Sequence, residues 1–474
     1  MVDKQDKIER VEFPYQLLRR WPDAEAENLC ASDATDRLLI DLAAPTIRSA
    51  APGSVVIIGD RYGALTLATL SLGATGVRVH QDSFAGQLAL AANEEALRGS
   101  GTHARIGSDR STLDEMPPPA EGGPVGEAVG NGVQIKRWLG NEAATEGAQA
   151  EGRPMGRPVD GEPRVSEGSA GSPAVEAVLA DREFTGYPLD SSLLTDARVV
   201  LIQLPKDLDQ FEHWIRLVAA YAAKDVRVYA GGRTKHMTKA MNQVLERFFS
   251  NVSASRARQK SRVLFASNLR LPRPDATDAF AETYDRDLDL WVCSVPGSFA
   301  SGKVDHGSRF LIDFIRTLPE PRPESQLVAA DLGCGTGVLA TVLVRSRPLG
   351  LSTGCHVIAT DRSAAAVKSA QATLRKNVPD GDWEVRQDNA LSQQADHSLD
   401  LIVCNPPFHS DAAVSTELSE LLFADAARVL KPGGIMLTVF NSHLPHRRSL
   451  ERMVGPTKQL GRNSKFTVTQ SIKR

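Results

Sequence analysis

The chain has 474 residues, which is more than one ordinary domain and enough for two or three domains that each bury a core. Lys and Arg number 55 against 58 Asp and Glu, so net charge alone does not indicate a nucleic-acid partner. The five cysteines are odd in number and lack C-x-x-C spacing, which argues against a disulfide framework or a zinc site. No signal-peptide core or long apolar run is present, so we expect a cytoplasmic protein with no membrane and no metal.

The first hundred residues alternate between helical and strand patterns, which is typical of an α/β domain. A glycine turn from Gly59 to Gly63 follows the first buried strand and opens a helix. We expect helices at residues 31–42 and 84–97, and strands at residues 54–59 and 77–80.

The composition changes at residues 116–173 to Gly, Pro, Glu and Ala, without sustained apolar periodicity. Such a segment cannot bury enough apolar surface to offset the entropy of ordering, so we expect a disordered insertion. The α/β pattern then resumes with strands at 197–204 and 226–230 and helices at 213–223 and 237–249. Residues 268–282 are expected to form a linker, followed by a strand at 291–295 and a helix at 308–317.

A second glycine turn, in residues 327–339, combines a buried strand ending at Asp331 with Gly333, Gly335 and Gly337 and then a helix. Glycines in such a turn allow close backbone approach to a nucleotide-like cofactor at a helix N-terminus. Asp361 ends the next strand, where it can accept hydrogen bonds from ribose hydroxyls or simply cap the following helix.

Two further strand ends carry polar residues that fit the same site. Asp388 and Asn389 follow the third strand and could hold the exocyclic amine of an adenine, although Asp388 could equally be a turn residue. The apolar run at 399–404 stops at Asn405, Pro406, Pro407 and Phe408. The two prolines rigidly present one amide and one aromatic ring at a strand end, which together with the glycine turn indicates methyl transfer onto a planar nitrogen.

The two halves repeat one another. Residues 58–65 correspond to residues 332–339, and the strand ending at 203–206 corresponds to the strand ending at 405–408. The first copy lacks the middle glycine and the Asn-Pro-Pro-Phe chemistry, so an internal duplication with a degenerate first copy is predicted.

Basic residues concentrate in two segments. Residues 224–262 contain ten basic and two acidic residues, and residues 431–474 contain nine basic residues and one acid. These segments are either a nucleic-acid footprint or ordinary solvated surface.

The order of glycine turn, acid, Asp-Asn and Asn-Pro-Pro-Phe resembles the class I S-adenosylmethionine-dependent methyltransferases that act on conjugated amino groups. Residues 296–311, 405–411, 430–434, 441–444 and 463–466 look like the ribosomal RNA guanine-N2 methyltransferases. The first copy is more similar to the large-subunit (23S rRNA) enzyme than to the small-subunit (16S rRNA) enzyme.

The resemblance implies an α/β fold of two tandem Rossmann-like class I methyltransferase domains. Residues 1–267 would be a degenerate, RNA-binding domain that carries the insertion, and residues 283–474 the catalytic domain that binds S-adenosyl-L-methionine. Asn405 and Pro406 would accept the N–H bonds of the target nitrogen, Phe408 would stack on the base, and Phe299 would line the cofactor site. The implied partner is ribosomal RNA. The sequence leaves the oligomeric state open, and we expect a monomer.

Other functions stay open at this point. A 16S rRNA guanine-N2 methyltransferase is the nearest alternative. A protein glutamine-N5 methyltransferase shares the Asn-Pro-Pro motif but typically has Tyr where this chain has Phe408, and a DNA adenine methyltransferase would need a target-recognition domain that is not apparent. A non-catalytic RNA-binding assembly factor would not need the intact motifs of the second copy.

Overall fold

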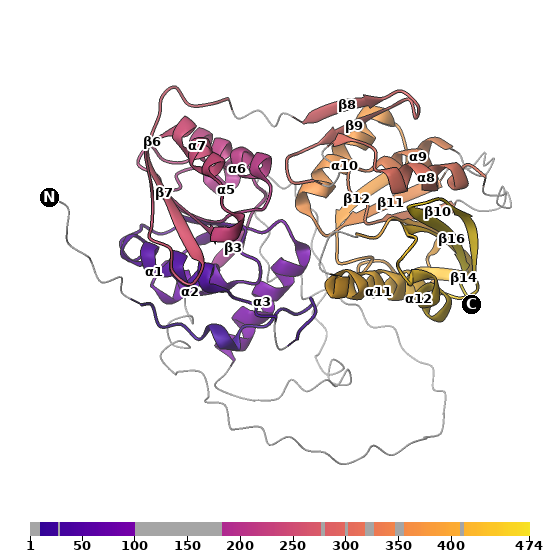
Figure 1. Ribbon diagram of the computed structural model, residues 1–474, viewed down its shortest axis with the longest axis horizontal. Helices are drawn as coiled ribbons and strands as arrows, with labels where there is room; N and C mark the ends of the chain where they lie inside the picture. Colours follow the sequence, from indigo (N-terminus) through magenta and orange to yellow (C-terminus); the bar gives the residue numbers. More distant parts are fainter. Residues whose placement is uncertain are drawn as a thin grey trace, which may run out of the picture.

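The computed structural model describes residues 10–26, 29–99, 183–275, 280–298, 302–317, 327–346, 355–407 and 412–474. The expected insertion at 116–173 and two expected site residues, Phe299 and Phe408, lie outside these ranges. The described residues form two lobes that lie side by side, each built around a seven-stranded sheet (Figure 1).

The first sheet has the strand order β3-β2-β1-β4-β5-β7-β6. Its first five strands are parallel, and β7 and β6 complete the sheet in antiparallel pairing. The strands are β1 (Val55–Ile58), β2 (Val77–His80), β3 (Phe184–Gly186), β4 (Val199–Gln203), β5 (Arg227–Arg233), β6 (Phe249–Ala254) and β7 (Ser261–Leu269).

The second sheet repeats this arrangement in the order β12-β11-β10-β13-β14-β16-β15. Its strands are β10 (Leu327–Leu332), β11 (Cys355–Asp361), β12 (Trp383–Gln387), β13 (Leu399–Cys404), β14 (Leu430–Asn441), β15 (Thr457–Arg462) and β16 (Phe466–Ile472). Because both sheets have the same order and directions, the predicted duplication of one α/β fold is confirmed.

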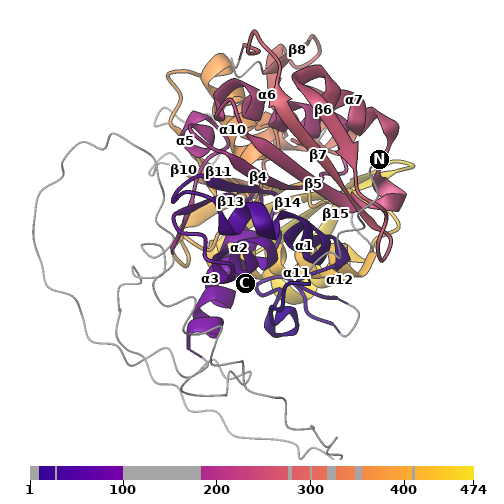
Figure 2. The same ribbon diagram turned by 90° about the vertical axis from the view of Figure 1, so that its left-hand side faces the viewer.

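Helices cover both faces of each sheet, as Figure 2 shows for the first lobe. One face of the first sheet carries α1 (Ala34–Arg48), α2 (Ala64–Ser71) and α3 (Phe84–Arg98), and the other carries α5 (Ser191–Leu194), α6 (Leu208–Tyr221) and α7 (Lys239–Phe248). Alternate residues of β1 point into the two cores, which explains why this strand is apolar throughout.

In the second lobe, one face carries α8 (His306–Ile315), α9 (Val338–Ser346) and α10 (Ala364–Asn377), and the other carries α11 (Ala412–Val429) and α12 (His446–Met453). A hairpin of β8 (Ala281–Asp285) and β9 (Leu290–Ser294) precedes α8 and packs against α10. In both lobes, β1 and β10 lie between strands whose crossovers run in opposite directions. The carboxyl ends of strands at such a switch point form the crevice in which open α/β sheets bind ligands.

Most expected elements are present, and β2 and β13 have the predicted bounds. Two helices were placed wrongly at their starts, because the capping residue decides where a helix begins. Asp33 accepts a hydrogen bond from the Thr35 backbone, so α1 begins at Ala34 rather than at residue 31. Asp207 caps α6 in the same way, so this helix begins five residues before the predicted start. The edge strands β6 and β15 were not predicted.

The two lobes join through equivalent loops. Ser83 caps α3 and Ser363 caps α10, and these two residues form an antiparallel bridge with one another. The Phe84 backbone N–H donates to the Arg362 carbonyl and the Ala364 N–H donates to the Asp82 carbonyl, each at 2.8 Å. This reciprocal pairing gives the duplicated chain a local two-fold relation at its interface.

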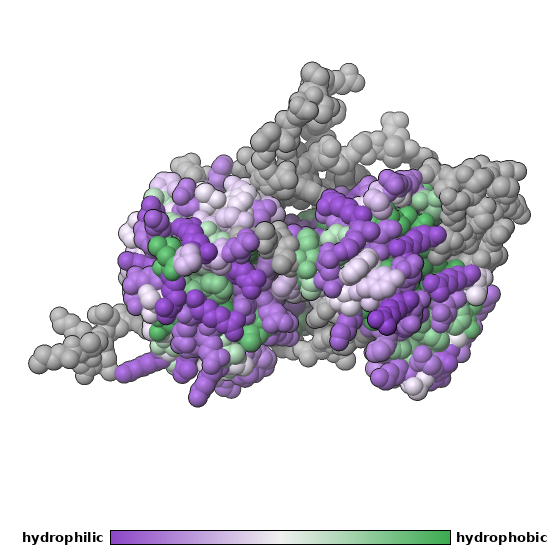
Figure 3. Space-filling model, turned by 90° about the horizontal axis from the view of Figure 1, so that it is seen from above, coloured by the Kyte–Doolittle hydropathy of each residue, from purple (hydrophilic) through white to green (hydrophobic). Residues whose placement is uncertain are grey.

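The face of the molecule seen in Figure 3 is mostly hydrophilic, with hydrophobic residues scattered among polar ones on both lobes. Among the described helices, none is long and apolar enough to cross a membrane.

Candidate active site and cofactor site

The glycine turn of the second lobe leaves open space above its backbone. Gly333, Gly335 and Gly337 all have positive φ angles, of 79°, 53° and 77°. A Cβ atom on Gly337 would lie 2.9 Å from Ala370, so this glycine is needed for helix packing. A Cβ atom on Gly333 or Gly335 would meet nothing within 4 Å. These two glycines therefore line a cradle that a cofactor can fill.

Asp331 lies under this turn and is fully buried. One carboxylate oxygen, Oδ2, accepts a hydrogen bond of 2.8 Å from the Ala340 backbone, while Oδ1 has no partner among the described residues. Burial raises the pKa of Asp331 to about 7, and the nearby Asp361 acts in the same direction. Asp331 thus fixes the first turn of α9, and its buried charge favours a cationic ligand nearby.

Asp361 lies at the end of β11, beside the glycine turn. Its two carboxylate oxygens accept hydrogen bonds from the backbone of Gly335, at 3.0 Å, and of Ser363, at 2.9 Å. Burial raises the pKa of Asp361, and these two bonds counteract the rise. The cap of α10 is Ser363, not Asp361, so the alternative role of Asp361 as the helix cap was wrong.

Asp388 and Asn389 differ in what they offer to a ligand. The Asp388 carboxylate accepts hydrogen bonds from the Asn389 and Gln393 backbones and from the Ser392 hydroxyl, all within its own turn. Burial raises the pKa of Asp388, and these bonds lower it. The side-chain oxygen of Asn389, in contrast, is buried and has no partner among the described residues. Of these two residues, Asn389 is therefore the one whose side-chain oxygen can accept a hydrogen bond from a ligand.

Asn405 stands directly after β13 with its amide held in one orientation. Its Nδ2 donates to the Asp305 carboxylate at 2.8 Å and to the Ser308 hydroxyl at 3.0 Å. An ionised carboxylate can only accept, so Asp305 determines which end of the amide faces it. The opposite end, Oδ1, is buried and has no partner among the described residues. The site therefore presents an unsatisfied acceptor at the end of a central strand.

Asp305 and Ser308 were not predicted as members of the site. Asp305 caps α8 by accepting from the Gly307 and Ser308 backbones, at 2.8 and 3.1 Å, and holds Asn405 with the same oxygen. The sequence signal was an N-cap residue at the start of a helix, and nothing in it pointed to a partner a hundred residues away.

The structure describes only some of the other predicted site residues. Pro406 is buried and Pro407 exposed immediately after Asn405, whereas Phe299 and Phe408 lie outside the described residues. No group of three His, Cys, Asp or Glu side chains among the described residues could hold a metal ion.

In the first lobe, side chains occupy the corresponding turn. Asp60 is buried there and accepts hydrogen bonds from the backbones of Gly63 and Thr66. Gln81, at the position of Asp361, donates to the carbonyls of Asp60 and Gly86 at 2.7 and 3.0 Å. A Cβ atom on Gly86 would lie 2.6 Å from the Arg61 carbonyl, so the loop is pressed onto α3. This turn lacks the cradle of the second lobe.

The two lobes match different families. Residues 289–470 match the Methyltransferase small domain, and residues 10–117 and 174–270 match the RLMG N-terminal domain. The chain is similar over 93% of its length to a solved structure of a T. thermophilus 16S rRNA N2 methyltransferase (RsmC) in complex with AdoMet and guanosine. The TM-score is 0.57, the sequence identity is 19%, and 92% of that chain is covered. The fold and the site define a class I methyltransferase that depends on S-adenosylmethionine.

Two relatives identify the family. A protein of Magnetococcus marinus named ribosomal RNA large subunit methyltransferase G is 30% identical over 274 residues, which cover 58% of this chain and 70% of the relative. A protein of the same name from Yersinia pestis (strain Pestoides F) is 30% identical over 282 residues, which cover 58% and 68%. The chain belongs to the family of ribosomal RNA large subunit methyltransferase G.

Proposed function

We propose that this protein transfers a methyl group from S-adenosyl-L-methionine to the exocyclic N2 of a guanine in large-subunit ribosomal RNA. The single observation that carries this proposal is the unpartnered Oδ1 of Asn405, held at the end of β13 by Asp305 and Ser308. The names of the two relatives supply the nucleic acid and the subunit.

The chemistry requires positioning more than acid–base catalysis. The cofactor supplies an electrophilic methyl group on a sulfonium centre. The guanine N2 is a poor nucleophile because its lone pair is delocalised into the ring. Asn405 Oδ1 and the Pro406 carbonyl would accept its two N–H bonds, which favours a pyramidal nitrogen with its lone pair directed at the methyl group.

The cofactor would lie along the cradle above Gly333 and Gly335. Asp361 would accept hydrogen bonds from the ribose hydroxyls, and Asn389 would accept one from the adenine amine. The buried carboxylates of Asp331 and Asp361 favour the sulfonium charge. Phe299 would line the cofactor site and Phe408 would stack on the guanine, which must leave its helix if it is paired.

The first lobe would hold the RNA, since its own turn has Arg61 and Gln81 in place of Gly335 and Asp361 while its basic segment at 224–262 is retained. A competing role is mechanical support of the second lobe. The pairing of residues 82–84 with residues 362–364 lies beside Asp361, so the first lobe also steadies the cofactor loop. The two roles are compatible, and only RNA holding requires the basic residues.

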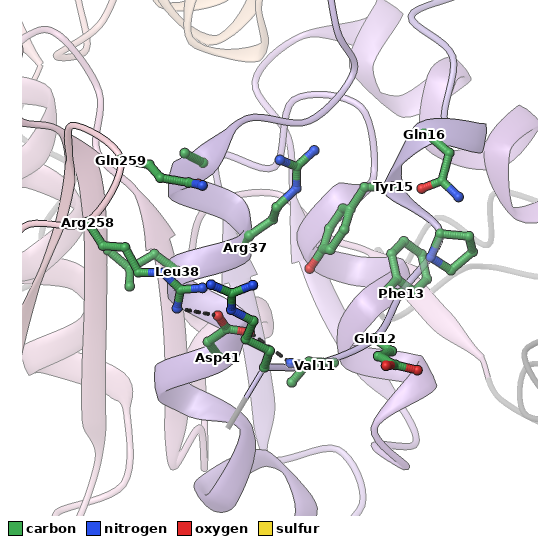
Figure 4. Close-up of a pocket in the computed structure, with 13 residues that line it drawn as sticks. Val11, Glu12, Phe13, Tyr15, Gln16, Arg37, Leu38, Asp41, Arg258 and Gln259 are labelled. Carbon is green, nitrogen blue, oxygen red and sulfur yellow. Dashed lines mark hydrogen bonds and ion pairs between the residues drawn. The ribbon is translucent and has the colours of Figure 1, made fainter. Parts of the chain in front are cut away.

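The turn between β6 and β7 contains Arg256, Arg258 and Lys260, which are candidates for RNA contacts. Arg258 lines a pocket of about 620 Å³ between α1 and the N-terminal segment, and Figure 4 shows its side chain pointing at Asp41. The Arg258 guanidinium donates to Asp41 at 2.9 Å, and Asp41 also accepts from the Val11 backbone. Arg258 therefore stabilises the lobe itself, so only the exposed Arg256 and Lys260 are suited to a test of RNA binding.

The decisive experiment uses ribosomal RNA from a strain that lacks this protein. Labelled methyl groups should enter large-subunit RNA, and nuclease mapping should recover them as N2-methylguanosine at one position. Label in small-subunit RNA or in a protein glutamine would contradict the proposal, and absence of any label would reject the enzymatic assignment.

A further inference from the structure

The first lobe contains a second pocket, of about 300 Å³, at the carboxyl ends of β4 and β5. Its walls come from the start of α1, the glycine turn, the segment after β4 and the short helix η3 (Thr234–His236). This size is at the lower limit of small-molecule sites, so the pocket suits one phosphate group with its sugar.

Cations dominate the lining of this pocket. Arg61, Lys206, Arg233 and Lys235 contribute to it together with His236, whereas Asp33 is its single carboxylate. Desolvation and the neighbouring cations lower the pKa of His236, in keeping with the positive charge of this lining. The lining is therefore strongly electropositive.

These charges are largely unpaired. Among the described residues, Arg61, Lys206 and Lys235 form no ion pair. Arg233 approaches Asp33 only at 4.0 Å, and its Nε is buried without a partner. Like charges brought together repel one another, so this arrangement costs stability unless an anion binds.

The pocket occupies the place of the target-base site in the second lobe. In the strand registers, Ile58 pairs with Ile202 and Leu332 with Cys404, so Gln203 takes the position of Asn405. Lys206 then stands where the second lobe has Phe408. Gln203 lines the pocket and is 6% exposed. A cation thus replaces the aromatic ring expected to stack on a base, which changes the site from base recognition to anion recognition.

We propose that this pocket binds a phosphodiester group of the RNA substrate and so fixes the RNA on the first lobe while the second lobe holds the target base. This inference rests on the proposed function for the identity of the RNA. The assignment of the pocket as an anion site depends only on the cavity and on the cations that line it.

The test is a triple variant, Arg61→Gln, Lys206→Gln and Arg233→Gln, in the full chain. Its affinity for a labelled large-subunit RNA fragment is measured by fluorescence anisotropy over a series of KCl concentrations. Loss of the contact to one phosphodiester means that about one counterion fewer is released on binding, so the slope of log K against log[KCl] should flatten by about one, and affinity should fall about tenfold or more. Lys206→Gln alone changes one exposed residue and should flatten the slope by about one or less.

The matched control is the triple variant Arg48→Gln, Arg198→Gln and Arg216→Gln. These residues lie in α1, directly before β4 and in α6, outside both the pocket lining and the basic segment 224–262, and carry the same charge. The control should bind RNA with the affinity and slope of the wild type. S-adenosylmethionine titration of every variant shows whether the second lobe is intact.

Two failures can be distinguished. If the wild type methylates large-subunit RNA but the pocket variants bind with the wild-type slope, or if the control flattens the slope equally, the pocket proposal is overturned. If no protein methylates this RNA but the slope flattens only in the pocket variants, the phosphate site stands and the proposed reaction is wrong.

Discussion

The two lobes share one scaffold but use its crevice differently. In each, a side-chain amide at the carboxyl end of the fourth strand donates to the first turn of the helix packed beside it. Asn405 donates to Ser308 at 3.0 Å, and Gln203 donates to Asp36 at 2.9 Å. In each, the amide oxygen has no partner among the described residues. The first lobe, which lacks the Asn-Pro-Pro-Phe motif, has therefore kept the hydrogen bond that orients the amide.

The glycine turn differs more deeply. In both lobes, a carboxylate accepts a hydrogen bond from the backbone N–H of the third residue of the helix that follows the glycine turn. Asp331 accepts from Ala340 and Asp60 accepts from Thr66, each at 2.8 Å. In the second lobe this carboxylate lies in the strand below the turn. In the first lobe it belongs to a residue of the turn itself. The same helix start is thus stabilised from a different position in the chain.

This comparison teaches that structural contacts persist after the ligand contacts are gone. Substitutions that exchange residues between the lobes test it most directly. The largest expected effect is that of Gly335→Arg, which places the first lobe's Arg61 in the second lobe. The new side chain would fill the open cradle, and the positive φ of 53° adds strain. Calorimetric titration should show loss of S-adenosylmethionine binding, and retained affinity would refute the assigned cradle.

The reverse exchange, Arg61→Gly, should create no second site. Gln81 would still stand in the place of Asp361, where it donates to the carbonyls of Asp60 and Gly86 and offers no carboxylate to a ribose. The same titration should give one cofactor per chain for this variant and for the wild type. A stoichiometry of two would show that the first lobe is closed by Arg61 alone.

Asn405→Ala should lower turnover by roughly two or more orders of magnitude, because loss of one positioned polar contact to a transition state costs about 3 kcal/mol. Cofactor affinity should stay within about twofold, since the role proposed for Asn405 is contact with the nucleobase and not with the cofactor. Single-turnover methylation measures this, and a near wild-type rate would refute the role of Asn405.

Ser308→Ala gives a graded comparison. It removes one of the two acceptors that orient Asn405 and leaves the bond to Asp305. We expect a fall in turnover of about tenfold or less, smaller than for Asn405→Ala. The conservative variant Ser308→Thr keeps a hydroxyl at this position, so it should lose less turnover than Ser308→Ala. Equal losses for the alanine and threonine variants would indicate disturbed packing instead of lost orientation.

The helix residue that accepts the amide hydrogen bond is Asp36 in the first lobe and Ser308 in the second. Only the first lobe therefore has an ionisable side chain at this position. Burial raises the pKa of Asp36 to about 8, with a further contribution from Asp33. This value lies above that of the unfolded chain, so the folded state holds an extra proton, and the associated stability is present below about pH 4 and lost as the pH rises toward 8. Asp36→Asn should therefore flatten the decline in unfolding free energy between pH 5 and 8, by up to about 1.4 kcal/mol per pH unit.

Urea unfolding across this pH range measures the difference between variant and wild type. Burial also raises the pKa of Asp60, so the wild-type slope has more than one source, and only the difference reports on Asp36. Asp209→Asn, on the exposed first turn of α6, is the control and should keep the wild-type slope. Parallel slopes for Asp36→Asn and wild type would contradict the raised pKa.

The sequence predicted those parts of the fold and site that depend on local patterns. The bounds of β13 and the position of Asn405 followed from an apolar run that ends at two prolines. The cradle followed from glycine spacing, and the duplication followed from repeated motifs. Each of these signals lies within about ten consecutive residues.

The remainder depends on contacts between distant residues. Asp305 and Asn405 meet because a helix N-terminus and a strand end share one edge of the sheet. The strand β15 was missed because most of its residues are partly or fully exposed and it lies at the sheet edge, so it carries no continuous apolar signal. Likewise, the sequence shows an acidic residue, Asp60, in the first glycine turn. Nothing in the sequence indicated that Asp60 makes the contact that Asp331 makes in the second lobe.

The smallest effect is expected from deletion of residues 118–172, a segment that only the first copy contains. In the second lobe, residues 378–382 alone connect α10 to β12. The equivalent connection in the first lobe runs from α3, which ends at Arg98, to β3, which begins at Phe184. The match to the RLMG N-terminal domain also stops at residue 117 and resumes at residue 174. Because the shortened connection is still far longer than that of the second lobe, melting temperature and methylation rate should stay close to wild type. A lowered melting temperature would show that the deleted residues pack against the first lobe, and weaker RNA binding at an unchanged melting temperature would assign them to the substrate.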